Sequence, residues 1–251
     1  MSVSGSAPEP GGFDLRGLLE NSLLEWEDHL AAVAVAGGCN WRCPYCHSWR
    51  YVIGLADINP IGIGEMFSLL ERQKGWIDGV VISGGEPTLQ PGLAEVARRI
   101  KDGGVKIKLH TNGSRPWVLR DLLVENLIDC LALDYKAPLD ERLFAVAGIA
   151  PDPAVLAAVK ESFGLIRSSG VDREYHTTLA PSFIGPEALA EMAVSLEGDG
   201  TWFLQQFENI DCLAPKTAGQ RRYDGGELDD LERLARECHG RVVIKRGKPA
   251  R

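Results

Sequence analysis

Short apolar runs alternate with amphipathic stretches along most of this chain. Runs of six to nine residues have apolar or β-branched centres and end in glycine or polar residues; they lie at 29–37, 78–84, 105–111, 128–136, 173–180, 202–207 and 241–246. Their nearly continuous apolar centres indicate burial on both faces, as in strands of a parallel sheet. These runs therefore predict six or seven strands.

Longer segments between the runs have apolar residues at spacings of three and four, which predicts amphipathic helices. They lie at 64–74, 92–104, 116–126, 152–170, 185–198 and 227–240. Several of them end in glycine, a common helix stop. The alternation of strand and helix predicts a parallel sheet with right-handed crossovers, which is either an open doubly wound sheet or a barrel.

A complete barrel of this kind needs eight strands. We therefore predict an α/β fold of the incomplete (β/α)6-type TIM barrel, with a parallel sheet and outer helices. Residues 1–14 are small, polar and rich in proline and glycine, so we expect a disordered lead-in, followed by a short amphipathic piece at 15–26. Because no linker or repeat is visible later, residues 15–251 are predicted to form a single domain.

The composition narrows the class of protein. Hydrophobic residues make up 45% of the 251 residues and charged residues 25%, which is ordinary for a protein with a full core. A net charge of −8 argues against a general nucleic-acid binder. No apolar run approaches the roughly 20 residues of a membrane span, and the first residues lack the pattern of a secretory signal. We expect a cytoplasmic protein that binds neither nucleic acid nor membrane.

Three of the six cysteines, Cys39, Cys43 and Cys46, lie within eight positions of one another directly after the first predicted strand. In a reducing compartment such clusters are more often metal ligands or redox groups than disulfides. Three thiolates are one short of a closed zinc site, whereas an iron-sulfur cluster held by three cysteines keeps one iron open. We favour the cluster; zinc, redox thiols and core packing remain alternatives. Cys130 and Cys238 are expected to be free and buried.

Other chemically unusual residues also follow the predicted strands. The segments Ser83 to Thr88, His110 to Ser114 and Leu133 to Lys136 end the second, third and fourth strands, and Gln205 and Gln206 lie in the sixth. Active sites of parallel α/β folds gather at the carboxyl edge of the sheet, so we expect these segments to converge. Alternation along a strand should point Asp134 and Lys136 into the same site and Tyr135 away from it.

Two of these motifs together resemble those of a known family. A C-x3-C-x2-C loop with Tyr45 before the last cysteine, followed by Gly-Gly-Glu-Pro after the second strand, resembles the radical S-adenosylmethionine (SAM) superfamily. The segments "LALDYKAP", "EYHTTL" and "WFLQQF" are similar to those of the activating proteins of anaerobic ribonucleoside-triphosphate reductase and, more distantly, to pyruvate formate-lyase activating enzymes. The resemblance runs from about residue 17 to residue 246.

The resemblance implies a 4Fe-4S cluster on Cys39, Cys43 and Cys46, with an open iron that SAM chelates. In such a site Glu86 receives the methionyl amine of SAM, and Gly84 and Gly85 let the backbone approach the ligand, where a Cβ would block it.

Further residues of the implied SAM site are Tyr45, which matches the aromatic residue against adenine, and Asp134 and Lys136, which match a pair that contacts SAM. Lys136 and the three cysteines are the residues expected to be catalytic. Asn112 either contacts the ligand or tolerates a left-handed turn. His176, also expected in the cofactor site, stands where relatives often carry Arg.

The chain departs from its relatives at His110. Relatives carry Asp at this position, which in pyruvate formate-lyase activators helps to bind a monovalent cation beside SAM. An imidazole cannot replace a carboxylate in that role.

The activity that the resemblance implies is that of a radical SAM activase. A reduced cluster cleaves SAM, and the 5'-deoxyadenosyl radical takes a Cα hydrogen from a glycine of a partner, such as an anaerobic ribonucleotide reductase or another glycyl radical enzyme. Flavodoxin or ferredoxin would supply the electron. The alternatives are a radical SAM enzyme that acts on a small metabolite or another peptide, and a non-enzymatic zinc or iron-sulfur module.

Overall fold

The computed structural model describes residues 11–247, and its centre is an eight-stranded sheet. The strands follow one another across the sheet in the order of the sequence, from β1 at one edge to β8 at the other. They are β1 (Leu15–Ser22), β2 (Ala31–Ala36), β3 (Gly79–Gly84), β4 (Lys106–Thr111), β5 (Cys130–Asp134), β6 (Asp172–Leu179), β7 (Thr201–Gln206) and β8 (Val242–Lys245). The sheet curves but does not close, which confirms the predicted incomplete barrel.

Strands β2 to β8 are parallel and correspond to the seven predicted runs. Strand β1 is the exception, because it pairs with β2 in the antiparallel direction. It occupies most of the amphipathic piece at 15–26, which was not predicted as a strand. Antiparallel neighbours need no crossover helix, so the eight residues between β1 and β2, 23–30, are enough to connect them, whereas the parallel strands of the later βα units need a crossover.

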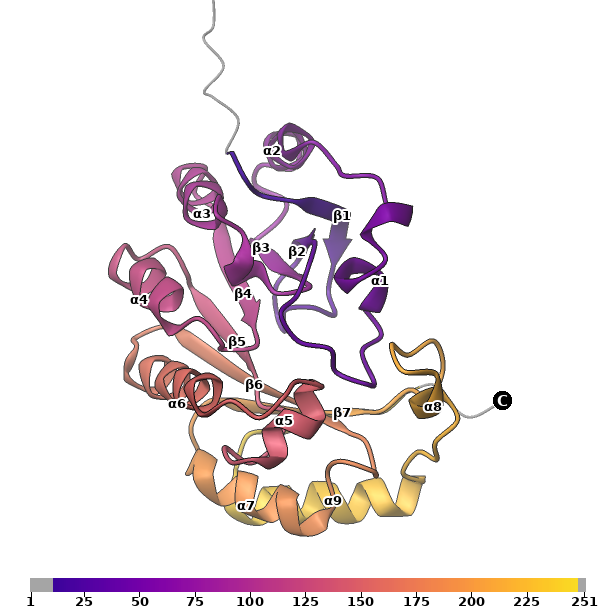
Figure 1. Ribbon diagram of the computed structural model, residues 1–251. Helices are drawn as coiled ribbons and strands as arrows, with labels where there is room; N and C mark the ends of the chain where they lie inside the picture. Colours follow the sequence, from indigo (N-terminus) through magenta and orange to yellow (C-terminus); the bar gives the residue numbers. More distant parts are fainter. Residues whose placement is uncertain (1–10, 248–251) are drawn as a thin grey trace, which may run out of the picture.

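Helices cover the outer side of the sheet in chain order (Figure 1). The six predicted helices are α2 (Ile63–Arg72), α3 (Leu93–Asp102), α4 (Pro116–Val124), α6 (Pro153–Ser168), α7 (Pro186–Leu196) and α9 (Gly225–Cys238). Short helices lie in the connections: α1 (Trp49–Val52), η1 (Leu55–Asp57), η2 (Pro87–Leu89), α5 (Arg142–Ala147) and α8 (Pro215–Ala218). None of the helices between residues 11 and 247 combines the length and the apolar character that a membrane crossing requires.

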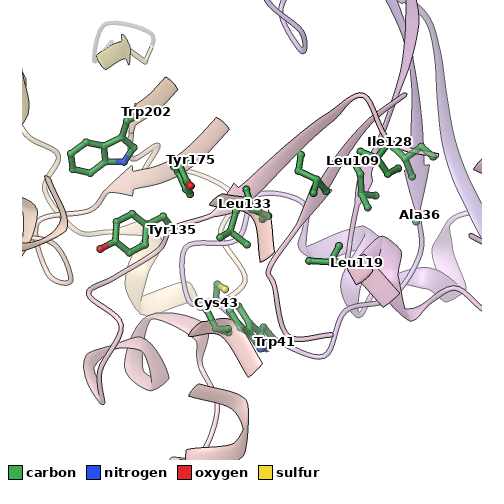
Figure 2. Packing of buried hydrophobic residues seen from close by; sticks show 14 of the residues in the cluster. Ala36, Trp41, Cys43, Leu109, Leu119, Ile128, Leu133, Tyr135, Tyr175 and Trp202 are labelled. Carbon is green, nitrogen blue, oxygen red and sulfur yellow. The ribbon is translucent and has the colours of Figure 1, made fainter. Parts of the chain in front are cut away.

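The main core fills the space between the sheet and the outer helices. Figure 2 shows Tyr135, Tyr175 and Trp202 close together in this layer, and the Tyr135 ring centre lies 6.4 Å from that of Tyr175 and 6.3 Å from that of Trp202. A smaller apolar cluster, which includes Val33, Val35, Val81 and Cys130, lies on the other face of the strands. Successive residues of a strand therefore point alternately towards the helix-covered core and towards the other face of the sheet.

The expected lead-in lies mostly outside the described residues, because its first ten positions are not among them. At its end, Phe13 is buried in the main core, and the Asp14 amide donates a hydrogen bond to Gln90 Oε1 at 2.9 Å. Cys130 is buried as predicted, but Cys238 is exposed, so the prediction of a buried thiol at the end of α9 is wrong. Cys238 is the last residue of α9, past the apolar positions that pack on the sheet.

Candidate active site

The carboxyl ends of the parallel strands surround a cavity of about 730 Å³. This volume is within the usual range of ligand sites, roughly 300–1,000 Å³. Every site residue predicted from the sequence lines it: Cys39, Cys43, Tyr45, Cys46, Gly84, Gly85, Glu86, Asn112, Asp134, Lys136 and His176. The predicted convergence of separate strand ends is therefore present in the structure.

The loop with the three cysteines follows β2 and is held by backbone hydrogen bonds on both sides. The Arg42 amide donates to the Ala147 carbonyl at 2.8 Å, at the end of α5, while the Leu213 amide donates to the Cys46 carbonyl at 3.1 Å. Gly148 is needed for this contact, because a Cβ there would lie 2.0 Å from the Arg42 carbonyl oxygen. Two distant segments of the chain thus fix the shape of the loop.

The three cysteines are free thiols that line one cavity, and their surroundings suit a cluster. Burial raises the pKa of Cys39 and of Cys43 to about 11, and it also raises the pKa of Cys46. These thiols are therefore protonated at neutral pH until a metal displaces the protons. Within residues 11–247, no three His, Cys, Asp or Glu side chains converge closely enough to share a single metal ion. Cysteine thiolates are the ligands that hold iron-sulfur clusters in proteins.

Glu86 is buried and joins the ends of β3 and β4. Its Oε1 accepts hydrogen bonds from the Thr88 amide, the Thr88 hydroxyl and the Thr111 hydroxyl at 3.1, 2.6 and 2.8 Å. Its Oε2 accepts one from the Asn112 amide at 2.7 Å. Burial raises the pKa of Glu86, while these donors lower it. Because a carboxylate has about four acceptor positions, roughly one, on Oε2, is left for a ligand.

Gly84 and Gly85 are required by contacts within the protein. A Cβ on Gly85 would lie 1.9 Å from the carbonyl oxygen of Gly38, at the start of the cysteine loop, and one on Gly84 would lie 2.5 Å from the Ala36 carbonyl oxygen. Gly84 also has a φ of 116°, a value that other residues rarely adopt. Both glycines were expected to let the backbone approach a ligand, and the packing of β2 against β3 is a second reason for them.

Asp134 and Lys136 face the cavity together, as their alternation predicted. Lys136 Nζ lies 2.9 Å from Asp134 Oδ2. Although burial lowers the pKa of Lys136, Asp134 raises it well above its ordinary value, so the ammonium stays charged. Tyr135 points the other way, and its hydroxyl lies 2.6 Å from Ser195 Oγ. Lys136 is therefore a fixed positive charge beside the thiols, suited to a carboxylate ligand.

Tyr45 and Asn112 complete the side of the cavity next to the cysteine loop. The Tyr45 hydroxyl is buried without a hydrogen-bond partner among the described residues, and its ring stands edge-on to Phe183 at 5.8 Å. Asn112 donates to Asn40 Oδ1 at 2.9 Å and lies 3.9 Å from Cys39 Sγ. The residue with positive φ in this turn is Gly113, at 75°, so the left-handed interpretation of Asn112 is wrong. An orphaned hydroxyl, a fixed ammonium and three thiols in one cavity together fit SAM and a cluster.

A sequence model of the radical SAM superfamily matches residues 33–185, which is more than half of the chain. The chain belongs to the radical SAM superfamily. The match covers the cysteine loop, the end of β3 that carries Glu86, and the Asp134–Lys136 pair. The family predicted from the sequence is confirmed.

Individual relatives differ in what they do. The chain is 29% identical to a Methanocaldococcus jannaschii protein that is named provisionally as a glycyl-radical enzyme activating enzyme, over 91% of this chain and 94% of that protein. It is 31% identical to 7-carboxy-7-deazaguanine synthase of Methanopyrus kandleri, over 40% of this chain and 47% of the synthase. The solved structure of Streptococcus suis SuiB bound to S-adenosylmethionine aligns with a TM-score of 0.64 at 16% identity. That alignment covers 84% of this chain and 48% of SuiB, so this chain spans about half of SuiB, and the likeness shows the shared fold.

A buried ion pair beneath the cavity of this radical SAM protein was missed by the sequence analysis. Lys108 Nζ of β4 lies 2.5 Å from Glu174 Oε2 of β6, and it donates a second hydrogen bond to the Glu25 carbonyl at 2.7 Å. The same Glu174 oxygen lies 2.8 Å from His176 Nε2. Because an ionised carboxylate only accepts, Nε2 carries the hydrogen, and Nδ1 of the neutral ring is left as an acceptor. Burial lowers the pKa of His176 and so favours the neutral ring.

His110 lies beside His176, with ring centres 5.0 Å apart. Its Nε2 is buried and has no hydrogen-bond partner among the described residues. Burial lowers the pKa of His110 well below its ordinary value, and the positive charges of Lys108 and Lys245 lower it further. A neutral ring with positive neighbours disfavours a cation at this position.

Proposed function

We propose that the chain is a radical SAM activase, which uses a 4Fe-4S cluster and SAM to install a glycyl radical on a partner enzyme. The observation that carries this proposal is the full-length likeness to a protein named provisionally as a glycyl-radical enzyme activating enzyme. The cavity supports it, because the cysteine loop, Glu86 and the Asp134–Lys136 pair line one space. We take residues 15–251 to be a single domain that works in the cytoplasm.

In the proposed reaction, Cys39, Cys43 and Cys46 hold the cluster. When bound, the cluster and SAM together supply one-electron chemistry, which yields methionine and 5'-deoxyadenosine. Lys136 binds the SAM carboxylate and is kept charged by Asp134. Glu86 uses its remaining acceptor position for the SAM amine, and Tyr45 lies against the adenine.

The remaining hydrogen atom and the electron come from other proteins. The hydrogen atom of 5'-deoxyadenosine comes from a glycine Cα of the partner, which keeps the unpaired electron. The partner is a glycyl radical enzyme, such as an anaerobic ribonucleotide reductase, and a flavodoxin or ferredoxin donates the electron.

The test uses anaerobically reconstituted protein reduced with dithionite and mixed with SAM and the host's own anaerobic ribonucleotide reductase. A glycyl doublet in the electron paramagnetic resonance spectrum, together with 5'-deoxyadenosine, is expected. Cys43→Ser should abolish both signals, whereas Cys238→Ser, which changes an exposed thiol, should leave them intact. If 5'-deoxyadenosine forms and no protein radical appears, the activase proposal is rejected.

A second candidate function is hydrogen abstraction from a small metabolite. It is favoured by His110, whose neutral ring cannot supply the carboxylate that the resemblance to activating enzymes implies at this position. The partial likeness to 7-carboxy-7-deazaguanine synthase also supports it. Such an enzyme would form 5'-deoxyadenosine in proportion to a small added substrate and without any partner protein, which separates the two candidates.

A further inference from the structure

Three neighbouring strands present a row of unused polar side chains to the cavity. Thr178 of β6 is in register with Gln205 of β7, and Gln205 is in register with Lys245 of β8. All three residues line the cavity. Because neighbouring strands lie about 4.8 Å apart, a hydroxyl, an amide and an ammonium group stand side by side across about 10 Å. We call Thr178, Gln205 and Lys245 the donor row.

Lys245 has no carboxylate within ion-pair distance in residues 11–247, unlike Lys108 and Lys136, which pair with Glu174 and Asp134. Its Nζ donates only a long hydrogen bond, 3.3 Å, to the Leu24 carbonyl, and it lies 4.9 Å from the centre of the Phe203 ring. Glu25 also lines the cavity but makes no ion pair with Lys245. The ammonium charge is therefore available to a ligand.

The other two members of the donor row are also uncommitted, in contrast to their neighbours on the same strands. Gln206 donates to the Tyr223 carbonyl at 2.7 Å and accepts from the Gly247 amide at 3.0 Å. The Thr177 hydroxyl accepts from Trp202 Nε1 at 2.9 Å and donates to a backbone carbonyl. No hydrogen bond among the described residues uses the side chains of Gln205 and Thr178. Gln206 and Thr177 therefore use their side chains to stabilise the fold, whereas the side chains of Gln205 and Thr178 are left open.

The charges around the donor row favour an anion. Of the acidic side chains in the cavity, Glu86 already accepts four hydrogen bonds and Asp134 is paired with Lys136. The remaining one, Glu25, is exposed. An anion beside Lys245 would gain a charge-assisted hydrogen bond in a partly enclosed site, where such bonds are stronger than in water.

We propose that the donor row binds an anionic group, a carboxylate or a phosphate, of the molecule that loses its hydrogen atom. This rests on the proposed function in one respect, namely that a second substrate enters the cavity beside SAM. The SAM carboxylate is assigned to Lys136, just beyond the end of β5, and β5 lies three strands away from β8, which carries Lys245, so the two anionic groups occupy different positions. The anion belongs either to an acidic side chain of a peptide loop or to a small acid.

The test measures anion binding by isothermal titration calorimetry and needs neither a reductant nor a partner. Inorganic phosphate and acetate are titrated into anaerobically reconstituted protein that has been saturated with SAM. We expect both to bind, and Lys245→Gln to weaken binding about tenfold or more, because one charge-assisted hydrogen bond is lost. Lys245→Arg should restore most of the affinity. Gln205→Met and Thr178→Val should each weaken it by a few-fold.

Lys160→Gln is the matched control, because it removes the same charge from an exposed position on α6. It should leave the affinity unchanged, and unchanged melting temperatures show that the variants are folded. The proposal is overturned if neither anion binds, if Lys245→Gln binds as tightly as the wild type, or if saturating SAM abolishes binding. The last outcome would mean that the anion enters the pocket of the SAM carboxylate.

Two further titrations identify the source of the anion. A blocked tripeptide Gly-Asp-Gly that binds more tightly than acetate, while Gly-Asn-Gly does not bind, supports a peptide loop. Phosphate that binds more tightly than either supports a small phosphorylated substrate. If anions bind but no glycyl radical forms on any partner, the donor row stands and the activase proposal fails, so the two failures can be distinguished.

Discussion

The buried pair of Lys108 and Glu174 gives the sharpest quantitative prediction. The side chains are 2% and 9% exposed, and their charged atoms are 2.5 Å apart. In Glu174→Gln the shape is kept and the amide oxygen can still accept one hydrogen bond, but Lys108 loses its counter-charge. Breaking a buried pair from one side typically costs about 3–5 kcal/mol of the free energy of unfolding.

The acid-base chemistry of lysine sets an upper limit to this cost. A buried lysine without a partner avoids the penalty by releasing its proton, and for an ordinary lysine this costs about 4.6 kcal/mol at pH 7. At pH 9 the same step costs only about 2 kcal/mol. The destabilisation by Glu174→Gln should therefore lie between about 3 kcal/mol and this limit of about 4.6 kcal/mol at pH 7, and should fall to about 2 kcal/mol or less at pH 9.

Urea unfolding followed by circular dichroism, at both pH values and without oxygen, measures these free energies. Adding Lys108→Met to Glu174→Gln should recover most of the loss, because no buried charge then remains. Glu125→Gln, which breaks the exposed pair with Arg98, should leave the unfolding midpoint unchanged. The reasoning is refuted if Glu174→Gln is as stable as the wild type at pH 7, if its cost is the same at pH 9, or if the double variant is no more stable than the single one.

Three further predictions concern the cavity. Burial lowers the pKa of both His110 and His176 from the ordinary 6.5, so stability should be lost as the pH falls below about 6.5 towards the folded-state pKa values. The melting temperature should fall less between pH 7 and pH 5 in the His110→Gln, His176→Gln double variant than in the wild type, and an equal fall in both would contradict this. Some fall should remain in the double variant, because burial also lowers the pKa of His239. Glu86→Gln should lower the free energy of unfolding in urea by about 2–4 kcal/mol, because the amide nitrogen of Gln cannot accept the hydrogen bonds that one carboxylate oxygen of Glu86 accepts. An unfolding midpoint equal to that of the wild type would contradict this. Gly85→Ala should prevent iron loading, measured as iron per chain, because its Cβ would overlap the Gly38 carbonyl, whereas Gly164→Ala, in open space on α6, should load normally.

The elements with a clear hydrophobic period could be predicted from the sequence, and β1 shows why others could not. Its apolar residues do not alternate, because register shifts interrupt the pairing between Leu15 and Gly17 and between Leu19 and Ser22. Leu19 is 50% exposed and Leu23, just beyond the strand, is 70% exposed, so the pattern does not mark a buried face. A bulged edge strand therefore resembles an amphipathic segment of no fixed type.

The candidate site also has features that could be predicted from the sequence and features that could not. The residue types that end each strand indicated the cavity, because parallel strands bring their carboxyl ends together. The role of Gly85, however, depends on Gly38, and that of Glu86 depends on Thr111, and neither contact is visible in the local sequence. Likewise Lys106 and Lys108 are two positions apart on one strand, yet Lys106 is exposed and Lys108 is buried. Only the tertiary fold distinguishes them.

The two sides of the cavity differ in how far their side chains are already used. On the side of the cysteine loop, Glu86, Asn112 and Lys136 each make hydrogen bonds or ion pairs within the protein, so this side is fixed before any ligand arrives. On the side of β6 to β8, Gln205 and Lys245 make no ion pair and almost no side-chain hydrogen bonds with the described residues. A side that is fixed in advance suits a ligand that is the same in every turnover. Polar groups without protein partners are hydrated, and they favour a ligand whose own polar groups replace the lost water. The choice of the molecule that loses its hydrogen atom should therefore depend on the donor row, and substitutions there should change the substrate preference before they change the formation of the cluster.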